Sequence, residues 1–361
     1  MQKIIPINNS DLHSPELTAF IEVVQHNSHI ADALYAGDYT LCVYLLKMRE
    51  MYRWERGIDF KTMLTTDDVG DWLTTREGLW DDVEEQDYKT LLINGIEHEP
   101  FDNELINPLL LESNLVYSAG LGIRCRPHFF VAELEERIVE NDYTILISGK
   151  EYARDMAAPA AMAQGNNIFI RRESLRRVIW EILDDARVQG LDNPLTRAMS
   201  FYEFETDAEE ALNKMTEAEI KYVIQHEIGE VKAGKILDES WNDMTIKLAR
   251  TQAEIMLRAT RDHLADSLTT LPTLIKNHQE NNASASLHFY FGNMTAMRKH
   301  LAPSLVEAYQ HWHDTGSLTE LTDLSKKLPE HWRGIATKVT TLYSQSADAE
   351  SIESLIKDHK I

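Results

Sequence analysis

Five consecutive residues of one expected helix carry the side chains best suited to chemistry in this sequence. They are His226, Glu227, Ile228, Gly229 and Glu230, within the run EAEIKYVIQHEIGEVKAG. His226 and Glu230 are four residues apart, so on a helix their side chains leave the same face and can converge on one ion. Glu227 lies beside them. The spacing predicts a metal site with a further carboxylate next to it.

The pentapeptide resembles the His-Glu-x-x-His motif of zincin metallopeptidases, in which two histidines bind zinc and the Glu takes a proton from the metal-bound water. Glu230 stands where that motif has its second histidine. A longer stretch, residues 157–234, is similar to gluzincins: AAPAAMAQGNNIFIRRES resembles their edge strand, and MTEAEIKYVIQHEIGE resembles their active-site helix. The resemblance implies Zn²⁺ as the cofactor and Glu227 as the catalytic base.

A gluzincin takes its third zinc ligand from a later helix, and the run TRDHLADS is the best supplier of one. The resemblance therefore implies His263 and Asp266, three residues apart on one helix face, as candidate ligands, with Glu254 as a weaker option. The ligands would then be two His and one Glu in permuted order. Asp266 or Asp262 would orient a ligand histidine through its other ring nitrogen. The alternative is a metal-free polar network that joins two helices.

Residues 167–171 follow a turn at Gly165 and are expected to form an exposed edge strand beside the site. An edge strand can bind an extended peptide by adding it to the sheet. The sequence therefore predicts a zinc-dependent, peptidase-like hydrolase that acts on a small peptide or an unidentified substrate.

A second group of potential ligands lies near the N-terminus: Glu22, His26, His29 and Asp32. Their spacing of three or four residues places them along one side of a helix, as in helical dimetal proteins of the ferritin type. This pattern suggests a metal-carboxylate oxidoreductase as an alternative function. The next expected helix contributes Arg49, Glu50, Arg53 and Glu55, and the charged residues of the two helices could instead form an Arg–carboxylate network or a hydrated surface. A third possibility is a non-catalytic interaction protein whose acidic surface recruits a basic partner.

The composition limits the classes of function. The chain has 361 residues and a formal net charge of -23, a sign that repels nucleic acids and anionic membranes. It has only two cysteines, Cys42 and Cys125, and no apolar stretch of about 20 residues that could span a bilayer. We expect a soluble cytoplasmic protein with no nucleic-acid or membrane partner. The composition carries no signal of oligomeric state.

Hydrophobic periodicity predicts an α+β protein that is predominantly helical. The expected regions are a helical N-terminal part (1–110), a zincin-like mixed α/β part (111–238) and a helical C-terminal part (239–361). Short β-branched runs predict strands at 115–117, 143–147 and 167–171. Helical spacing predicts helices at 67–80, 129–140, 174–188, 216–237, 244–277 and 296–314.

Over most of residues 20–315 the chain resembles an uncharacterised family of proteobacterial cytoplasmic proteins. The resemblance is carried by HIADALYAGDYTLCVYLLKMREMYRW, RPHFFVAEL, RDHLADSLTTLP and SLHFYFGNMTAMR. It implies no activity, so the expectation of a metal site depends on the residues described above.

Overall fold

The computed structural model describes residues 15–122, 125–189 and 192–361, which form two compact units, one ending at Arg177 and the other beginning at Val178. The fold is α+β and mostly helical, as expected, with one curled mixed sheet. The two units differ from the three-part division expected from the sequence. The strands pack against N-terminal helices, and the helix that carries His226 packs against C-terminal helices.

The first unit combines four helices with two sheets. Its helices are α1 (Pro15–Tyr35), α2 (Leu41–Arg56), α3 (Thr66–Val83) and α4 (Asn103–Leu110), and its 3₁₀ turns are η2 (Ala36–Asp38) and η3 (Leu111–Ser113). Its strands are β1 (Leu91–Ile93), β2 (Ile96–His98), β3 (Leu115–Leu121), β4 (Pro127–Val139), β5 (Thr144–Arg154), β6 (Ala161–Gln164) and β7 (Asn167–Arg171). Helix α5 (Arg172–Gln189) follows β7 and crosses the boundary between the units.

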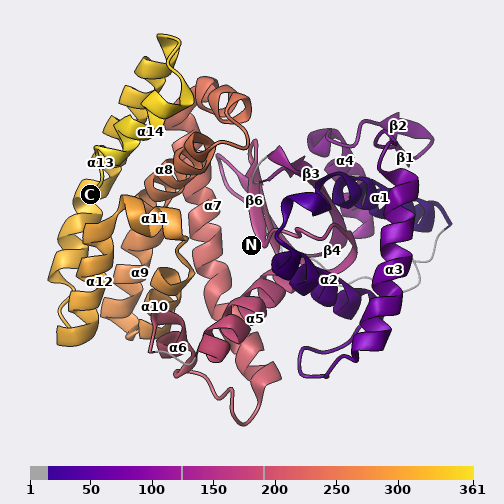
Figure 1. The fold of residues 1–361 in the computed structure, drawn as a ribbon, viewed down its shortest axis with the longest axis horizontal. Helices are drawn as coiled ribbons and strands as arrows, with labels where there is room; N and C mark the ends of the chain where they lie inside the picture. The colour runs from indigo at the N-terminus through magenta and orange to yellow at the C-terminus, as the bar shows by residue number, and fades with distance from the viewer. Residues whose placement is uncertain (1–14, 123–124, 190–191) are drawn as a thin grey trace. The chain divides into compact units, whose positions relative to one another are not determined.

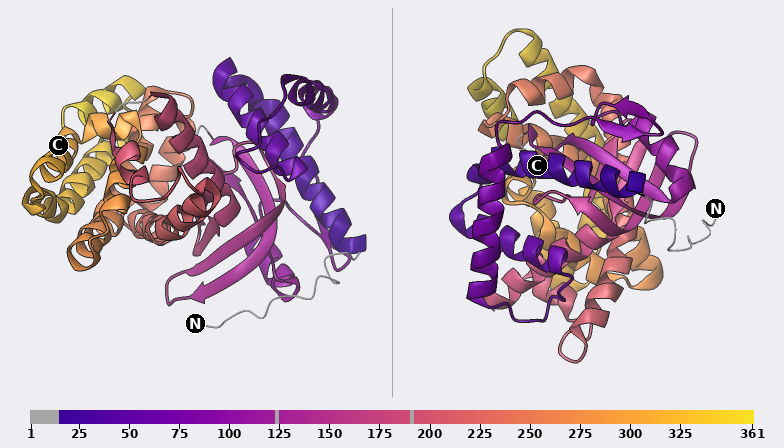
Figure 2. Two further views of the ribbon diagram at one scale, coloured as in Figure 1. Left: turned by 90° about the horizontal axis from the view of Figure 1, so that it is seen from below. Right: turned by 90° about the vertical axis from the view of Figure 1, so that its right-hand side faces the viewer.

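The larger sheet has the strand order β3-β4-β5-β7-β6, and only the β5–β7 pair is parallel. Helix α1 packs along β4 and β5, as the indigo helix in Figure 2 shows. Phe20 and Val24 of α1 share a buried cluster with Tyr117 and Phe129 of the sheet. This apolar contact fixes one helical layer on the sheet.

The expectation that residues 167–171 form an edge strand is wrong. Strand β7 pairs with β5 on one side, from Asn167 to Arg171, and with β6 on the other. The reason is the turn at Gly165, where a positive φ of 56° reverses the chain and places β6 over that side of β7. Strand β7 therefore has no free edge to which a peptide could add.

The helix expected at residues 129–140 is also wrong, because residues 129–139 belong to strand β4. Phe129 and Val131 pack in the cluster that includes α1, whereas Phe130 and Ala132 pack in a separate cluster on the other face of the sheet. A strand that is buried on both faces has no polar alternation, so its continuous apolar run looks like a helix.

The second unit is helical throughout its described residues. After α5 come α6 (Pro194–Met199), α7 (Ala208–Lys247), α8 (Gln252–Leu268), α9 (Thr270–Asn281) and α10 (Ser284–Asn293). The chain ends with α11 (Ala296–Leu301), α12 (Pro303–Thr315), α13 (Thr319–Ser344) and α14 (Ala349–Lys357). Helices α7 and α8 lie side by side (Figure 1), and α8 also contacts α9, α11, α13 and α14.

The single helix expected at 244–277 is divided in the structure. Helix α7 ends at Lys247, and Arg250 takes a positive φ of 68°. The hydroxyl of Thr251 then accepts a hydrogen bond from the Glu254 backbone N–H and begins α8. The cap allows the chain to turn, so α8 runs back along α7.

A glycine permits the close contact between α7 and α8. A Cβ atom added to Gly229 would lie 2.4 Å from the Ala265 carbonyl oxygen and 2.6 Å from Thr269 Oγ1. The Thr269 hydroxyl also donates a 2.6 Å hydrogen bond to the Gln225 carbonyl of α7. The two helix backbones can approach this closely only because residue 229 has no side chain.

We predict that Gly229→Ala lowers the free energy of unfolding by about 1–3 kcal/mol, because the added methyl group forces α7 away from α8. Gly234→Ala is the matched control, since a Cβ there meets nothing within 4 Å on the same helix. That change should raise stability by about 0.5–1 kcal/mol through helix propensity. Urea unfolding measures both, and equal effects of the two substitutions would contradict the close packing.

Candidate metal centre

Three side chains from α7 and α8 form a group that could hold a metal ion. Each of His226, Glu230 and Asp262 offers one ligand atom, and these atoms all lie within 4.8 Å of one another. His226 and Glu230 come from one face of α7, as their spacing predicts, and Asp262 comes from α8. Gly229 lies between the two α7 residues, so the close helix contact brings Asp262 within reach.

His226 is oriented by a buried carboxylate. Its Nδ1 atom lies 2.7 Å from Asp266 Oδ1, which leaves Nε2 as the ring atom able to bind an ion. Burial alone would lower the pKa of His226, but the Asp266 carboxylate raises it to about 10, with help from Glu227 and Glu230. A carboxylate behind a histidine is the usual arrangement that fixes the ring of a metal ligand. Asp266, a candidate ligand from the sequence, thus lies behind the His226 ring and is not one of the three residues of the group.

Asp266 also joins His226 to two later helices. Its Oδ2 atom pairs with the Arg298 guanidinium of α11 and accepts a 3.0 Å hydrogen bond from the Tyr290 hydroxyl of α10. Burial would raise the pKa of Asp266, but Arg298 and then His226 hold it well below its usual range. The carboxylate is therefore ionised, and each of its oxygens has a polar partner.

Only one of the two carboxylate oxygens of Glu230 has a polar partner among the described residues. Its Oε2 atom lies 2.5 Å from Arg261 Nη2, while Oε1 is buried and has no hydrogen-bond partner among the described residues. Burial raises the pKa of Glu230, and Arg261 opposes this shift. An unpaired buried oxygen is costly, and a cation is one way to satisfy it.

Glu227 lies next to the group without belonging to it. Its side chain is buried, with 6% of the residue exposed, and the structure gives its carboxylate no hydrogen bond to a described residue. Burial raises the pKa of Glu227 to about 7, although the neighbouring His226 opposes the change. A carboxyl group with this pKa can accept and return a proton near neutral pH.

The structure does not bring His263 to this group. Its Nε2 atom lies 2.9 Å from the Arg298 carbonyl oxygen, and its ring stacks on Trp332 at 4.5 Å between centroids. Burial lowers the pKa of His263 to about 3, so the ring is neutral. Consecutive helix residues point about 100° apart, which turns His263 away while Asp262 and Asp266 share the face toward α7. The third candidate ligand is thus Asp262, and its i, i+4 spacing from Asp266 was the signal for it.

The weaker option, Glu254, is not in the group either. Its carboxylate is buried and lies 2.6 Å from Nε of Arg258, a residue one turn later on the same helix α8.

The N-terminal histidines and carboxylates do not form a comparable group. His26 lies 3.2 Å from the Gln86 side chain, and the His29 ring contacts Arg76. Asp32 accepts the Met156 backbone N–H, and Glu22 is exposed. Burial lowers the pKa of His29 to about 3, with a further contribution from Arg76. Nearby ion pairs join Arg76 of α3 to Glu55 of α2, and Arg49 and Arg53 to Glu50 within α2.

A buried carboxyl group on α7 was not recognised from the sequence. Glu219 lies one turn before Tyr222 and is buried, and it accepts a 2.7 Å hydrogen bond from the Ser286 hydroxyl of α10. Burial raises the pKa of Glu219 to about 8, although Ser286 and Lys221 oppose the shift. The sequence around Glu219 has the spacing of an amphipathic helix, and nothing in that spacing indicates that this glutamate is buried.

Comparison with known proteins places the chain in a family. Residues 19–171 match the N-terminal domain of a family of unknown function, DUF6866, and residues 176–359 match its C-terminal domain. The chain belongs to this family. Its two matched domains correspond to the two compact units of the structure. No curated protein and no solved structure is similar enough to match.

Family membership confirms the expectation of an uncharacterised family, and it assigns no activity. The comparisons lend no support to the local similarity with gluzincins. None of the helices in the described part of the chain combines the length and apolar character of a membrane span.

We predict that Asp266→Asn destabilises the metal-free protein by about 3 kcal/mol or more, because Arg298 and His226 lose the charge that compensates their own. Asp262→Asn is the control, since Asp262 is only partly buried, and it should cost less than about 1 kcal/mol. Urea unfolding in excess EDTA measures both changes without a contribution from metal. A small effect of Asp266→Asn would show that this carboxylate does not hold the helices together.

Glu219 should make stability depend on pH. Because its pKa rises from 4.5 to about 8 on folding, the native state keeps a proton that the unfolded state releases. Its contribution is complete below pH 4.5 and is lost as the pH rises through about 8. Glu219→Gln should therefore match wild type near pH 4.5 and exceed it by roughly 2 kcal/mol or more at pH 8.5. A stability difference that does not change with pH would contradict the assignment.

Proposed function

We propose that the C-terminal unit is a metal-dependent hydrolase, with one divalent ion, Zn²⁺ in the first instance, held by His226, Glu230 and Asp262. The observation that carries the proposal is the convergence of these three donors, with Asp266 fixing the His226 ring from behind. One imidazole nitrogen with two carboxylates suits zinc and leaves a coordination position open. Glu230 Oε1, which lacks a partner among the described residues, supports the fit.

The bound ion would supply a polarised water molecule and a site for the substrate oxygen. Glu227 is the residue proposed to take the proton from that water, because it is buried beside His226 and its pKa lies near neutrality. Asp266 engages Nδ1 of His226, which would leave Nε2 to hold the ion. Arg261, which pairs with Glu230, must share that carboxylate with the ion or move to a substrate oxygen.

The class of substrate proposed is a small compound with a hydrolysable carbonyl group. Binding of an extended peptide along residues 167–171 is not part of the proposal, since β7 is paired on both sides. A small peptide or an ester remains compatible with the ligand set. The cytoplasm is the proposed location.

Metal binding gives the first test. After dialysis against Zn²⁺ and removal of free ion, elemental analysis should find about one zinc per untagged wild-type chain. His226→Ala should lose the metal. His311→Ala, which removes an exposed histidine on α12, should keep it. Wild type that retains no zinc would contradict the proposal.

The second test separates catalysis from metal binding. Glu227→Gln should keep the zinc and reduce hydrolysis of a panel of nitrophenyl esters and short fluorogenic peptides by about 10² or more, because the proton acceptor is lost. If the zinc-loaded wild type is inactive on the whole panel, or if Glu227→Gln is as active as wild type, the assignment of Glu227 as catalytic base is wrong.

A further inference from the structure

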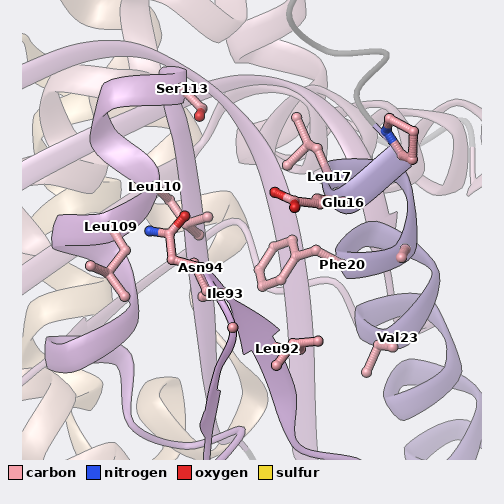
Figure 3. A pocket seen from close by; sticks show the side chains of 13 residues that line it. Glu16, Leu17, Phe20, Val23, Leu92, Ile93, Asn94, Leu109, Leu110 and Ser113 are labelled. Carbon is pink, nitrogen blue, oxygen red and sulfur yellow. The ribbon is translucent and has the colours of Figure 1, made fainter.

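An apolar pocket opens on the first unit between α1, the β1–β2 hairpin and α4 (Figure 3). Its volume is about 570 Å³, within the range of ligand-binding pockets. Apolar side chains from all three elements form most of its lining, among them Phe20, Leu92 and Leu109. The proposed metal centre lies in the other unit, so this pocket needs a separate explanation.

Polar side chains are few among the residues that line the pocket. Figure 3 shows Glu16, Asn94 and Ser113 interspersed with Leu17, Leu109 and Leu110, and of the three polar residues only Glu16 carries a charge. Glu16 is exposed and lies in the first turn of α1. A carboxylate at the mouth of an apolar pocket favours an occupant that carries both apolar and cationic groups.

Exposed apolar side chains extend the pocket into a longer surface. Leu105 and Leu109 are four residues apart on α4, and both are exposed, while Ile106 and Leu110 form the buried face of that helix. On the hairpin, Leu92, which lines the pocket, is 60% exposed. Large exposed apolar groups gathered around one pocket are typical of a protein interface rather than a small-molecule site.

The two segments that supply the lining are acidic, and Glu16 is the acidic residue among the lining residues themselves. These segments, residues 15–23 and 91–113, contain no Lys or Arg. The same two segments carry seven exposed acidic residues: Glu16, Glu22, Glu97, Glu99, Asp102, Glu104 and Glu112. A second copy of the chain would present the same charges and be repelled, as would an anionic membrane. The charge complements a basic partner.

We propose that this surface docks a basic amphipathic segment of another protein. Apolar side chains spaced three or four residues apart would enter the pocket and follow Leu105 and Leu109 along α4. Lys or Arg residues on the flanks of the segment would face Glu16 and the other carboxylates. The apolar anchors supply most of the affinity, and the charges select against acidic segments.

The test is selection of a random 16-residue peptide display library on the full-length protein. Peptides enriched on wild type should combine apolar residues at helical spacing with Lys or Arg. Leu92→Arg should weaken the binding of the selected peptides by about tenfold or more, because it removes an apolar anchor and adds a like charge. Leu92 is largely exposed, so the variant should fold, and circular dichroism checks this.

Met63→Arg is the matched control, because it adds the same charge at a 91% exposed residue that does not line the pocket. It should change affinity by less than about twofold. Equal losses in the two variants would mean that the peptides follow only the net charge of the protein, and the proposal would be wrong. It would also be wrong if the enriched peptides lack basic residues, or if sedimentation shows a wild-type dimer that Leu92→Arg converts to a monomer.

Discussion

The buried carboxylate of Asp266 is the interaction on which the candidate site depends. It contacts His226 of α7, Tyr290 of α10 and Arg298 of α11, so one side chain of α8 links three other helices. Such a group is stable only while its positive partners are in place, because a lone buried charge is very unfavourable. Its requirement for partners fixes the orientation of the His226 ring.

The same electrostatic arrangement sets the conditions for metal binding. Without an ion, His226 carries a proton held by Asp266, and Arg261 occupies one oxygen of Glu230. A metal ion must therefore compete with the proton on His226 and with the guanidinium at Glu230. Asp262 and the unpaired Glu230 Oε1 are the contacts that favour the ion. The same residues can therefore form either a metal-free polar network or a metal centre. Which of the two is present depends on whether the ion displaces the proton and the guanidinium.

The sequence predicted the parts of the site that lie within one helix. The i, i+4 spacing of His226 and Glu230 was sufficient to place them on one face, and the position of Glu227 followed from it. The partner from α8 depended on how that helix is rotated against α7. That rotation follows from the close contact at Gly229, a tertiary feature that helical spacing does not contain. For this reason the sequence pointed to His263, whereas the structure brings Asp262 to His226 and Glu230.

In the fold, too, features set by neighbouring residues could be predicted from the sequence, whereas features set by packing between distant segments could not. The strands expected at residues 115–117, 143–147 and 167–171 coincide with parts of β3, β5 and β7, apart from residue 143, because β-branched runs are a local signal. The position of β7 within the sheet depends on the β6 pairing across Gly165, and the β4 segment is buried on both faces. Neither feature can be read from periodicity along one strand.

The most direct measurement is anomalous X-ray diffraction at the zinc absorption edge from crystals of the protein equilibrated with Zn²⁺. If the site binds zinc, one strong peak is expected about 2.0–2.2 Å from His226 Nε2 and from carboxylate oxygens of Glu230 and Asp262, with Asp266 still bound to Nδ1. A map with no peak between α7 and α8, and with Arg261 still paired to Glu230, would show that these residues form a purely structural network.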